Sequence, residues 1–439
     1  MTNKILFIAY HFPPDAAVGA LRTQKFVKYL PQYGWQPFVL TVEDRHYSVH
    51  DPNRLIDIKQ AIIQRTTFWR SPLQIYLNLR DKYIKKNISH SNEANNNYKT
   101  HRFHCKSKLL YIKQIFTHLN HLPDDKLYWS IPGFFEGIKL LKKNNIEKTI
   151  VSVPPHSSLI LAYLLSVFSG SKLVVDFRDP WTLAYQSFSS ISFLNKFENL
   201  IEKKVLNRSS GIITTNKYFQ KALSTQYPNF SKKIYVIPNG YDSSDFPEIN
   251  NNHRHNKYII SYLGTFYLQR NPENFLMALS LFLSDKEWIN PAIEVRFIGF
   301  VHNAQGLSVK TMIQEYKLDN IVKIMGFVPH SETLKLMIES DLLLLFAPNQ
   351  PYQIPAKTYE YIATQKPILA LTENGATSSL IYEVQCGICV NPNDVEGIRI
   401  ALHTLYENHL NNKQYFNYNC LLYERRKEAE NLANLINIL

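Results

Sequence analysis

Residues suited to anion binding stand at two loops where an apolar, strand-like run leads into a helical pattern. The first loop, residues 11–22, contains Gly19 and Arg22. The N–H groups and the dipole of a helix N-terminus favour negative charge, Gly19 permits close backbone approach, and Arg22 adds a fixed charge. This loop therefore suits a phosphate or a carboxylate. An ordinary strand-to-helix turn is the alternative.

The second loop, residues 262–272, repeats the scheme with Gly264, Thr265 and Arg270. It predicts a second phosphate cradle, against the alternative of a connecting loop with no ligand. The apolar loop at residues 323–330 also follows a predicted strand and could receive a flat base.

Lys357 and Glu360 stand three residues apart after Pro355, so they share one face at the start of a predicted helix. A lysine can bind a phosphate, and a carboxylate can accept both hydrogens of a ribose diol. A surface salt bridge is the alternative.

Two further strand ends in the first half carry polar or aromatic residues. His156 follows the strand that ends near residue 153, and a strand at 173–177 leads directly into Arg178, Asp179 and Trp181. Ligands of doubly wound folds bind at this carboxyl edge of the sheet. The structural alternative is an internal Arg178–Asp179 pair with Trp181 in the core. Asp176, inside the strand, is expected to be a structural hydrogen-bonding group.

The elements that must position these residues alternate between short apolar strands and amphipathic helices, which predicts two doubly wound α/β domains. We expect residues 1–248 to form an N-terminal Rossmann-like domain and residues 249–414 a C-terminal one. A terminal helix is expected within 415–439. The polar stretch at 249–256, which has no periodicity, is interpreted as a linker between the domains or a surface loop beside it. The stretch at 87–104 is interpreted as an insertion in the first domain, with a loop that contacts an acceptor or a membrane as the alternative. The expected strands are 5–10, 38–42, 149–153, 173–177, 211–215, 234–237, 258–263, 294–298, 322–325, 342–346 and 368–371.

Composition narrows the class of protein. The 439 residues are 45% hydrophobic and 13% aromatic, as in a globular enzyme, and favour two domains. Four cysteines are too few for a disulfide scaffold, and the pair Cys386 and Cys389 lacks the other ligands of a zinc site, so both are expected to be small buried hydrophobes. The apolar runs at 5–10 and 159–168 are too short for a signal peptide and a membrane span, respectively. The chain is expected to be soluble or peripheral to a membrane.

Charge is distributed unevenly along the chain. Residues 1–248 hold 33 lysines and arginines against 18 carboxylates, while residues 249–439 hold 16 against 18. A basic first half could meet nucleic acid, anionic lipid or a phosphorylated substrate. No basic recognition helix or stacking-aromatic module is apparent, so nucleic acid is not expected as a partner.

The motifs together resemble the retaining glycosyltransferases of the GT-B fold, specifically the large family four, over essentially the whole chain. The resemblance implies that Gly264, Thr265 and Arg270 lie at the donor diphosphate, that the region of Phe327 meets the base and that Glu360 binds the ribose. Ser378 would lie near the diphosphate, and the terminal helix would pack back on the first domain. Residues 1–248 would then form the acceptor side and residues 249–414 the donor side. Gly19, Lys357 and Tyr359 are also assigned to donor binding. The motifs that carry the resemblance are Tyr10-His-Phe-Pro-Pro-Asp with Gly19, Asp176-Phe-Arg-Asp-Pro-Trp, Ile237-Pro-Asn-Gly-Tyr-Asp, the loop from Gly264 to Arg270, and Lys357-Thr-Tyr-Glu-Tyr with Lys366-Pro.

The chain departs from the family pattern at two places. The family often has a glutamate eight residues before the position of Glu360, where this chain has Tyr352. Many members have a histidine after the fifth strand, where this chain has Arg178. The first departure puts a sugar contact in doubt, and the second a catalytic role.

We expect transfer of a sugar from a nucleoside-diphosphate sugar to an acceptor hydroxyl, with retention, in cell-surface polysaccharide or glycolipid synthesis. Arg178, Asp179 and Arg270 are the candidate catalytic residues, and Arg22, His156, Arg178 and Trp181 the acceptor side. No cofactor or metal is expected, because no Asp-x-Asp strand end is present and basic groups can neutralise the diphosphate. We expect a cytoplasmic location and an anionic membrane surface as a partner. The acceptor is expected to be a saccharide, which is lipid-linked in one alternative. A nucleotide-sugar epimerase of similar fold and, more distantly, a nucleic-acid-binding protein are the rival interpretations.

Overall fold

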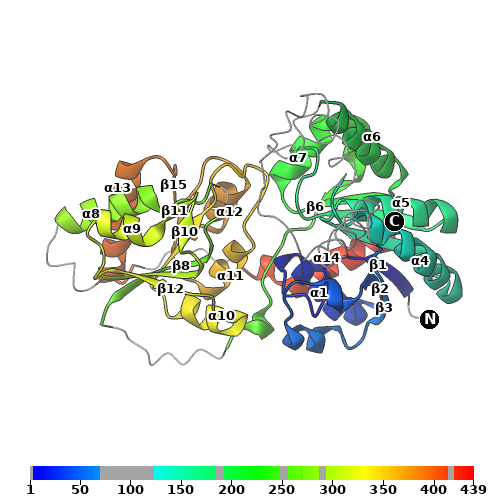
Figure 1. The fold of residues 1–439 in the computed structure, drawn as a ribbon, viewed down its shortest axis with the longest axis horizontal. Helices are drawn as coiled ribbons and strands as arrows, with labels where there is room; N and C mark the ends of the chain where they lie inside the picture. The colour runs from blue at the N-terminus through cyan, green and yellow to red at the C-terminus, as the bar shows by residue number, and fades with distance from the viewer. Residues whose placement is uncertain are drawn as a thin grey trace, which may run out of the picture. The chain divides into compact units, whose positions relative to one another are not determined.

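The computed structural model describes residues 3–69, 123–183, 192–247, 256–267, 269–285, 293–413 and 420–439. The polar tract at 87–104 and almost all of the linker predicted at 249–256 lie outside these residues. The chain divides into two compact units (Figure 1): the first comprises Met1–Ile213, Lys232–Ile234 and Ile436–Leu439, and the second Thr214–Ser231 and Tyr235–Leu435. The division into acceptor and donor sides predicted from the sequence stays a prediction.

A sheet of seven strands forms the centre of the first unit, in the order β3-β2-β1-β4-β5-β6-β7. The pairs β1–β2, β1–β4, β2–β3 and β4–β5 run parallel. The chain runs from β1 outward to β3 and then returns to β4 on the other side of β1, so the direction of winding switches between β1 and β4. The strands are β1 (Asn3–Ile8), β2 (Trp35–Val42), β3 (Ile62–Thr66), β4 (Lys148–Val153), β5 (Lys172–Phe177), β6 (Gly211–Thr214) and β7 (Ile234–Val236).

Burial explains which of these strands the sequence predicts. Residues 5–8 of β1 are buried on both faces, as a central parallel strand requires. β3 is missing from the predicted set because it is an edge strand in which Gln64 and Arg65 interrupt the apolar residues.

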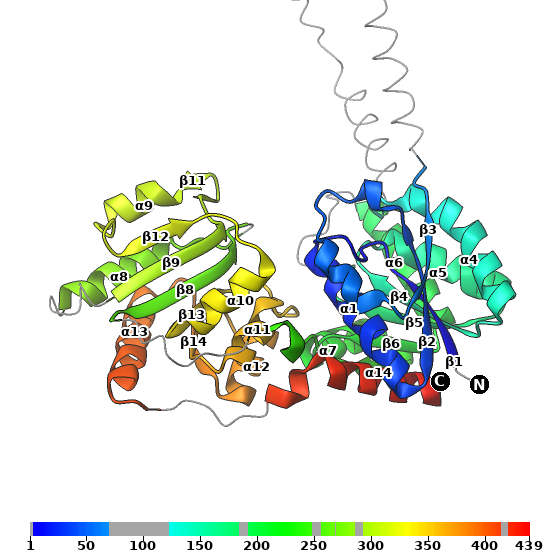
Figure 2. The ribbon, with the colours of Figure 1, turned by 90° about the horizontal axis from the view of Figure 1, so that it is seen from below.

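Helices cover both faces of this sheet. Right-handed crossovers place α4, α5 and α6 on one face and α1 on the other (Figure 2). A Cβ on Gly133 or Gly137 of α4 would lie under 3 Å from a leucine side chain of α5, so these glycines allow the two helices to pack closely. The helices that follow the strands of this sheet are α1 (Val18–Tyr29), the 3-10 helix η3 (Pro52–Ile58), α4 (Ser130–Asn144), α5 (Ser157–Ser169), α6 (Ser192–Arg208) and α7 (Lys217–Gln226).

The second unit has a six-stranded sheet in the order β12-β9-β8-β13-β14-β15, with parallel pairing. Here the direction of winding switches between β8 and β13. The strands are β8 (Tyr258–Thr265), β9 (Ile293–Phe300), β12 (Val322–Met325), β13 (Leu342–Phe346), β14 (Ile368–Leu371) and β15 (Gly387–Val390), and β10 (Asn303–Ala304) and β11 (Leu307–Ser308) form a separate hairpin.

The two-residue period of β13 places alternate side chains on opposite faces. Leu342, Leu344 and Phe346 belong to the core beneath α8, α9 and α13, whereas Leu343 and Leu345 belong to the core beneath α10, α11 and α12. The helices are α8 (Glu273–Asp285), α9 (Val309–Glu315), α10 (His330–Ile338), α11 (Lys357–Thr364), α12 (Ala376–Val384) and α13 (Val395–Leu410), with the 3-10 helices η6 (Ser243–Asp245) and η8 (Cys420–Tyr423).

The chain ends in α14 (Arg425–Ile438), within the segment where a terminal helix is predicted. The Lys148 and Lys172 ammonium groups donate to the carbonyls of Ile436 and Leu439, which belong to the first unit. Across the described residues, no helix is long and apolar enough to cross a membrane.

Candidate active site

The loops that follow β8 and β13 meet at the winding switch of the second sheet, where ligands of doubly wound folds bind. β8 ends at Gly264 and Thr265, the loop that follows it carries Arg270, and the loop after β13 leads into α11, which carries Lys357 and Glu360. The fold therefore places Gly264, Thr265 and Arg270 at the same edge as the start of α11, whereas Gly19, also predicted for the donor, lies in the first unit.

Glycines line this edge where β8 and β9 end. Gly264 and Gly299 face each other in the two strands, and the Gly299 amide donates to the carbonyl of Gly326, which follows β12, at 3.2 Å. Gly299 has a φ of 114° and a Cβ there would lie 2.2 Å from the Gly264 carbonyl oxygen, so only glycine fits. Glycine at position 299 thus allows β8 and β9 to pair closely at this edge.

Arg270 is held beside this edge by two tyrosines. Its guanidinium carbon lies 4.5 Å from the centre of the Tyr267 ring, and its side chain is hydrogen-bonded to the Tyr262 phenol. Nε of Arg270 is buried and has no hydrogen-bond partner among the described residues. A buried donor without a partner is costly, and an anion would satisfy it.

Glu360 is held by one cation and one imidazole. Its Oε2 lies 2.7 Å from Nζ of Lys357, and its Oε1 lies 3.1 Å from Nε2 of His330 at the start of α10. Burial acts to raise the pKa of the Glu360 carboxyl, but the charge of Lys357 and the hydrogen bond from His330 outweigh it and lower this pKa to about 2. The Lys357–Glu360 salt bridge considered as the alternative is present, with side chains 29% and 12% exposed, and ribose binding by Glu360 stays a prediction.

Two exposed aromatic rings stand at the ends of neighbouring strands. Phe300 ends β9 and Phe327 follows β12; they are 64% and 68% exposed, and their ring centres lie 5.6 Å apart. Exposed rings of this kind present a flat apolar surface on which a planar group can stack. The sequence pointed to Phe327 but not to Phe300.

The side chains of two residues predicted to bind the sugar donor, Tyr359 and Ser378, make contacts inside the second unit. Tyr359 is buried in the core against Tyr423, with ring centres 5.7 Å apart. The buried Ser378 hydroxyl accepts from the Gly375 amide at 2.9 Å and caps α12. Their donor contacts stay predictions, and this burial argues against a contact through either side chain.

In the first unit, the corresponding winding switch lies between the loops after β1 and β4. Arg22 does not reach this edge as a free charge: its Nε and Nη2 donate to the Asp176 carboxylate at 2.9–3.1 Å, and both side chains are nearly fully buried. The predicted structural role of Asp176 is confirmed. A contact between Arg22 and an acceptor stays a prediction. The burial of the Arg22 side chain argues against such a contact.

Arg178 follows β5 at the same edge of the first sheet and donates hydrogen bonds to three backbone carbonyls. Its Nε donates to the Val153 carbonyl at 3.2 Å, and its terminal nitrogens donate to the carbonyls of Gly19 and Pro154. A Cβ on Gly19 would lie 2.5 Å from the Arg178 guanidinium, so this side chain would have to shift to make room for it. The donor contact predicted for Gly19 and the catalytic roles predicted for Arg178 and Asp179 stay predictions.

His156 and Trp181 form a stack at this edge, with ring centres 5.0 Å apart and planes 8° from parallel. Burial and the charge of Arg178 lower the pKa of His156 to about 3, so its imidazole is neutral at physiological pH. Its Nε2 is buried and has no hydrogen-bond partner among the described residues. Trp181 is itself buried, as in the structural alternative, and hydrogen-bonds to Glu198 of α6.

Two carboxyls near this stack were not predicted. Asp124 accepts from the Ser157 amide at 2.8 Å at the start of α5, and burial raises the pKa of both Asp124 and Glu198. Neither stands in a motif, because Asp124 is 33 residues from Ser157 and only the fold brings them together.

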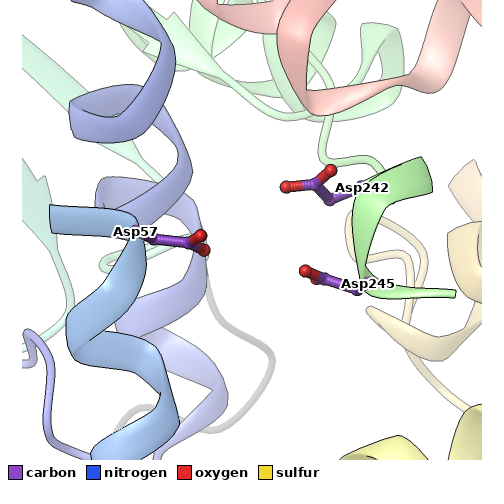
Figure 3. Close-up of side chains that lie close together, drawn as sticks. All are labelled: Asp57, Asp242 and Asp245. Atoms are coloured by element: carbon purple, nitrogen blue, oxygen red, sulfur yellow. The ribbon is translucent and has the colours of Figure 1, made fainter.

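Three acidic residues, Asp57, Asp242 and Asp245, are candidate metal ligands by residue type. Asp57 and Asp242 each interact with a residue of their own unit. Figure 3 draws Asp57 on η3, and Asp242 and Asp245 at η6. Asp57 pairs with Lys25 at 2.8 Å, and Asp242 caps η6 by accepting from the Ser244 amide at 3.0 Å. The expectation that no metal takes part stays a prediction. Of the two cysteines of the CxxC spacing, Cys386 is buried and Cys389 half-buried, and both are free.

Two parallel, doubly wound sheets, each with polar side chains at its winding switch, define a two-domain α/β protein of the GT-B class. Comparison with known proteins agrees with this class. Residues 97–245 match the family described as Glycosyltransferase Family 4, and residues 245–420 match the family described as Glycosyl transferases group 1. The chain is thus similar to glycosyltransferases over residues 97–420.

Solved structures share the whole fold at low sequence identity. HepE of Anabaena, in complex with UDP, matches with a TM-score of 0.64 at 14% identity, over 100% of both chains. Sucrose-phosphate synthase of Thermosynechococcus elongatus matches with a TM-score of 0.66 at 16% identity, over 99% of this chain and 98% of that one. These matches establish the GT-B fold.

A curated relative shares part of the sequence. The capsular polysaccharide biosynthesis glycosyltransferase CapH of Staphylococcus aureus is 26% identical over 196 residues, which are 44% of this chain and 52% of CapH. The chain therefore spans about half the length of the curated relative it matches.

Proposed function

We propose that this glycosyltransferase moves a sugar from a nucleoside-diphosphate sugar to a saccharide hydroxyl, with retention, in the synthesis of a cell-surface polysaccharide or glycolipid. The observation that carries the proposal is the ionised, half-buried Glu360 at the winding switch of the second unit. Each of its oxygens already accepts one hydrogen bond and keeps a further acceptor site, so together they can receive the two hydroxyls of a ribose.

The remaining donor contacts follow from the surrounding groups. Gly264 and Thr265 would approach the diphosphate through backbone, Arg270 and Lys357 would neutralise it, and the base would stack on Phe300 or Phe327. Uridine is the first base to test, because structures of HepE, which has the same fold, were determined with UDP and with UDP-glucose. Arg270 would act most as charge develops on the leaving diphosphate.

The acceptor would bind at the corresponding edge of the first unit, near the His156–Trp181 stack, with Arg178 and Asp179 completing the site. The partial match to CapH, whose name refers to capsular polysaccharide, supports a saccharide acceptor. A lipid-linked form of this acceptor would require the enzyme at a membrane, and the negative surface of an inner leaflet would attract the basic first half.

Calorimetric titration with UDP and UDP-glucose tests the donor site. Glu360→Gln keeps the shape but removes the charge, and should weaken binding by about 1.5–3 kcal/mol, the scale of a hydrogen bond to a charged group. Glu332→Gln, at an exposed position of α10, is the matched control and should leave affinity unchanged. Equal affinity of wild type and Glu360→Gln would contradict the proposal.

A further inference from the structure

Large apolar side chains are exposed on the outward surfaces of three neighbouring helices of the first unit. α5 lies between α4 and α6 on one face of the sheet (Figure 2). Large exposed apolar groups gathered on one surface of a protein are typical of an interaction site. We define the α4–α6 surface by Ile131 and Phe135 of α4, Val167 and Phe168 of α5, and Phe197 and Leu200 of α6.

The packing beneath this surface fixes the rings. Phe134 contacts both Phe135 and Phe168 edge to face, with ring centres 5.6 and 5.4 Å apart, although Phe135 and Phe168 are 65% and 63% exposed. Gly137 lets α4 approach α5 closely, because a Cβ there would lie 2.8 Å from Leu165. The exposed rings are therefore held outward by packed neighbours, and their binding would cost little conformational entropy.

The charges around these rings are almost all positive. The carboxylates of α6, Glu198 and Glu202, are buried on its inner side, and within the described residues of α4, α5 and α6 the outward carboxylate is that of Glu136. The exposed lysines of the same helices are Lys139, Lys142 and Lys143 on α4, and Lys196, Lys203 and Lys204 on α6.

We propose that the α4–α6 surface docks on an anionic lipid bilayer. Lysines attract the headgroups, while phenylalanine and leucine side chains enter the boundary between headgroups and acyl chains. A second copy of the chain is the less suitable occupant, because pairing this surface with itself would bring the lysines together.

The same helix connects this surface to the candidate acceptor edge. α6 exposes Phe197 and Leu200 outward, while Glu198 on its inner side hydrogen-bonds to Trp181, which stacks on His156. Docking would therefore hold the acceptor edge near the membrane. This step rests on the proposed function, in that a lipid-linked saccharide would be the acceptor.

Co-sedimentation of the full chain with vesicles tests the proposal, comparing pure phosphatidylcholine with mixtures containing phosphatidylglycerol, at low and high salt. Binding should require the anionic lipid and decrease with salt, because interactions between exposed charges are screened beyond about 8 Å at physiological ionic strength and over shorter distances at higher salt. Lys203→Gln with Lys204→Gln should lower partitioning by roughly thirtyfold, since each lysine near such a surface contributes about 1 kcal/mol. Phe135→Ala with Phe168→Ala should lower it severalfold at both salt concentrations.

Two control pairs in the second unit separate the surface from general effects. Lys310→Gln with Lys335→Gln changes the same net charge, and Ile400→Ala with Leu410→Ala removes exposed apolar groups. Both should leave partitioning unchanged. No binding at low salt, equal loss in the controls, or a change in oligomeric state without a change in vesicle binding would each overturn the proposal.

UDP affinity measured without vesicles keeps this test separate from that of the donor site. It should be the same in wild type and in the α4–α6 variants, because the proposed donor site lies in the second unit, and an unchanged Tm in thermal denaturation shows that the variants fold. A chain that binds UDP but no vesicles would overturn the docking proposal alone.

Discussion

The carboxylate of Glu360 lies 3.1 Å from Nε2 of His330, which comes from a different helix 30 residues earlier in the chain. Since the carboxylate is ionised, His330 must donate this hydrogen bond, and its tautomer is thereby fixed. Together with Lys357, His330 fixes the orientation of the side chain that would bind ribose. His330 is thus a positioning residue for the proposed donor site.

His330→Ala should weaken UDP binding by about 0.5–1.5 kcal/mol, the net contribution of one hydrogen bond. His330→Gln can donate from its amide and should restore most of the affinity. Calorimetry of both variants checks this, with His302→Ala, at an exposed histidine of the same unit, as the control. Equal losses in the alanine and glutamine variants would indicate that His330 does not act through its N–H.

The pKa of His156 predicts how stability depends on pH. Its folded-state pKa of about 3 lies below the usual value of 6.5, so the unfolded chain binds a proton that the folded chain rejects as pH falls below about 6.5. Between about pH 6 and pH 4 this one group should therefore reduce the free energy of unfolding by up to roughly 1.4 kcal/mol per pH unit. In His156→Gln that slope should be absent from chemical denaturation measured at several pH values. An unchanged slope would show that His156 is protonated in the folded state.

The buried Arg22–Asp176 pair should be essential for stability. Arg22→Met leaves the Asp176 charge buried without its partner and should cost about 3–5 kcal/mol. Lys427→Met, which removes one partner of the exposed pair with Glu430, should cost under about 1 kcal/mol. Urea denaturation of both variants makes the comparison. A small effect of Arg22→Met would mean that water reaches Asp176.

Arg270→Ala should reduce kcat more than it raises KM for the donor, because the charge that Arg270 neutralises develops as the diphosphate leaves. Arg270→Lys should recover only part of the rate, since lysine keeps the charge but loses the planar guanidinium that stacks on Tyr267. Steady-state kinetics of donor consumption with saturating acceptor separates the two parameters. A change confined to KM would show uniform binding instead.

The fold was largely predictable because its central strands are continuous apolar runs followed by polar loops. The same regularity identified Gly264, Arg270 and Glu360, since the carboxyl ends of parallel strands meet at one edge. β3 was missed because an edge strand needs few apolar residues, and the hairpin of β10 and β11 because two-residue strands carry no period.

Side-chain partners distant in sequence could not be predicted. Arg22 was interpreted as a free cation, but Asp176, 154 residues away, neutralises it in the core. His330 and Phe300 have no pattern around them that indicates binding, and their significance comes from Glu360 and Phe327, which the fold places beside them.

The central claim is that the second unit binds a nucleoside-diphosphate sugar around Glu360. Thermal denaturation of wild type and Glu360→Gln with a panel of nucleotides and nucleotide sugars tests it most directly, because a ligand at about a hundred times its Kd adds roughly 2.7 kcal/mol to the stability of the folded state. We predict that one nucleoside diphosphate and its sugar conjugate raise the Tm of the wild type and raise that of Glu360→Gln much less. No stabilisation by any member of the panel, or equal stabilisation of both proteins, would contradict the account.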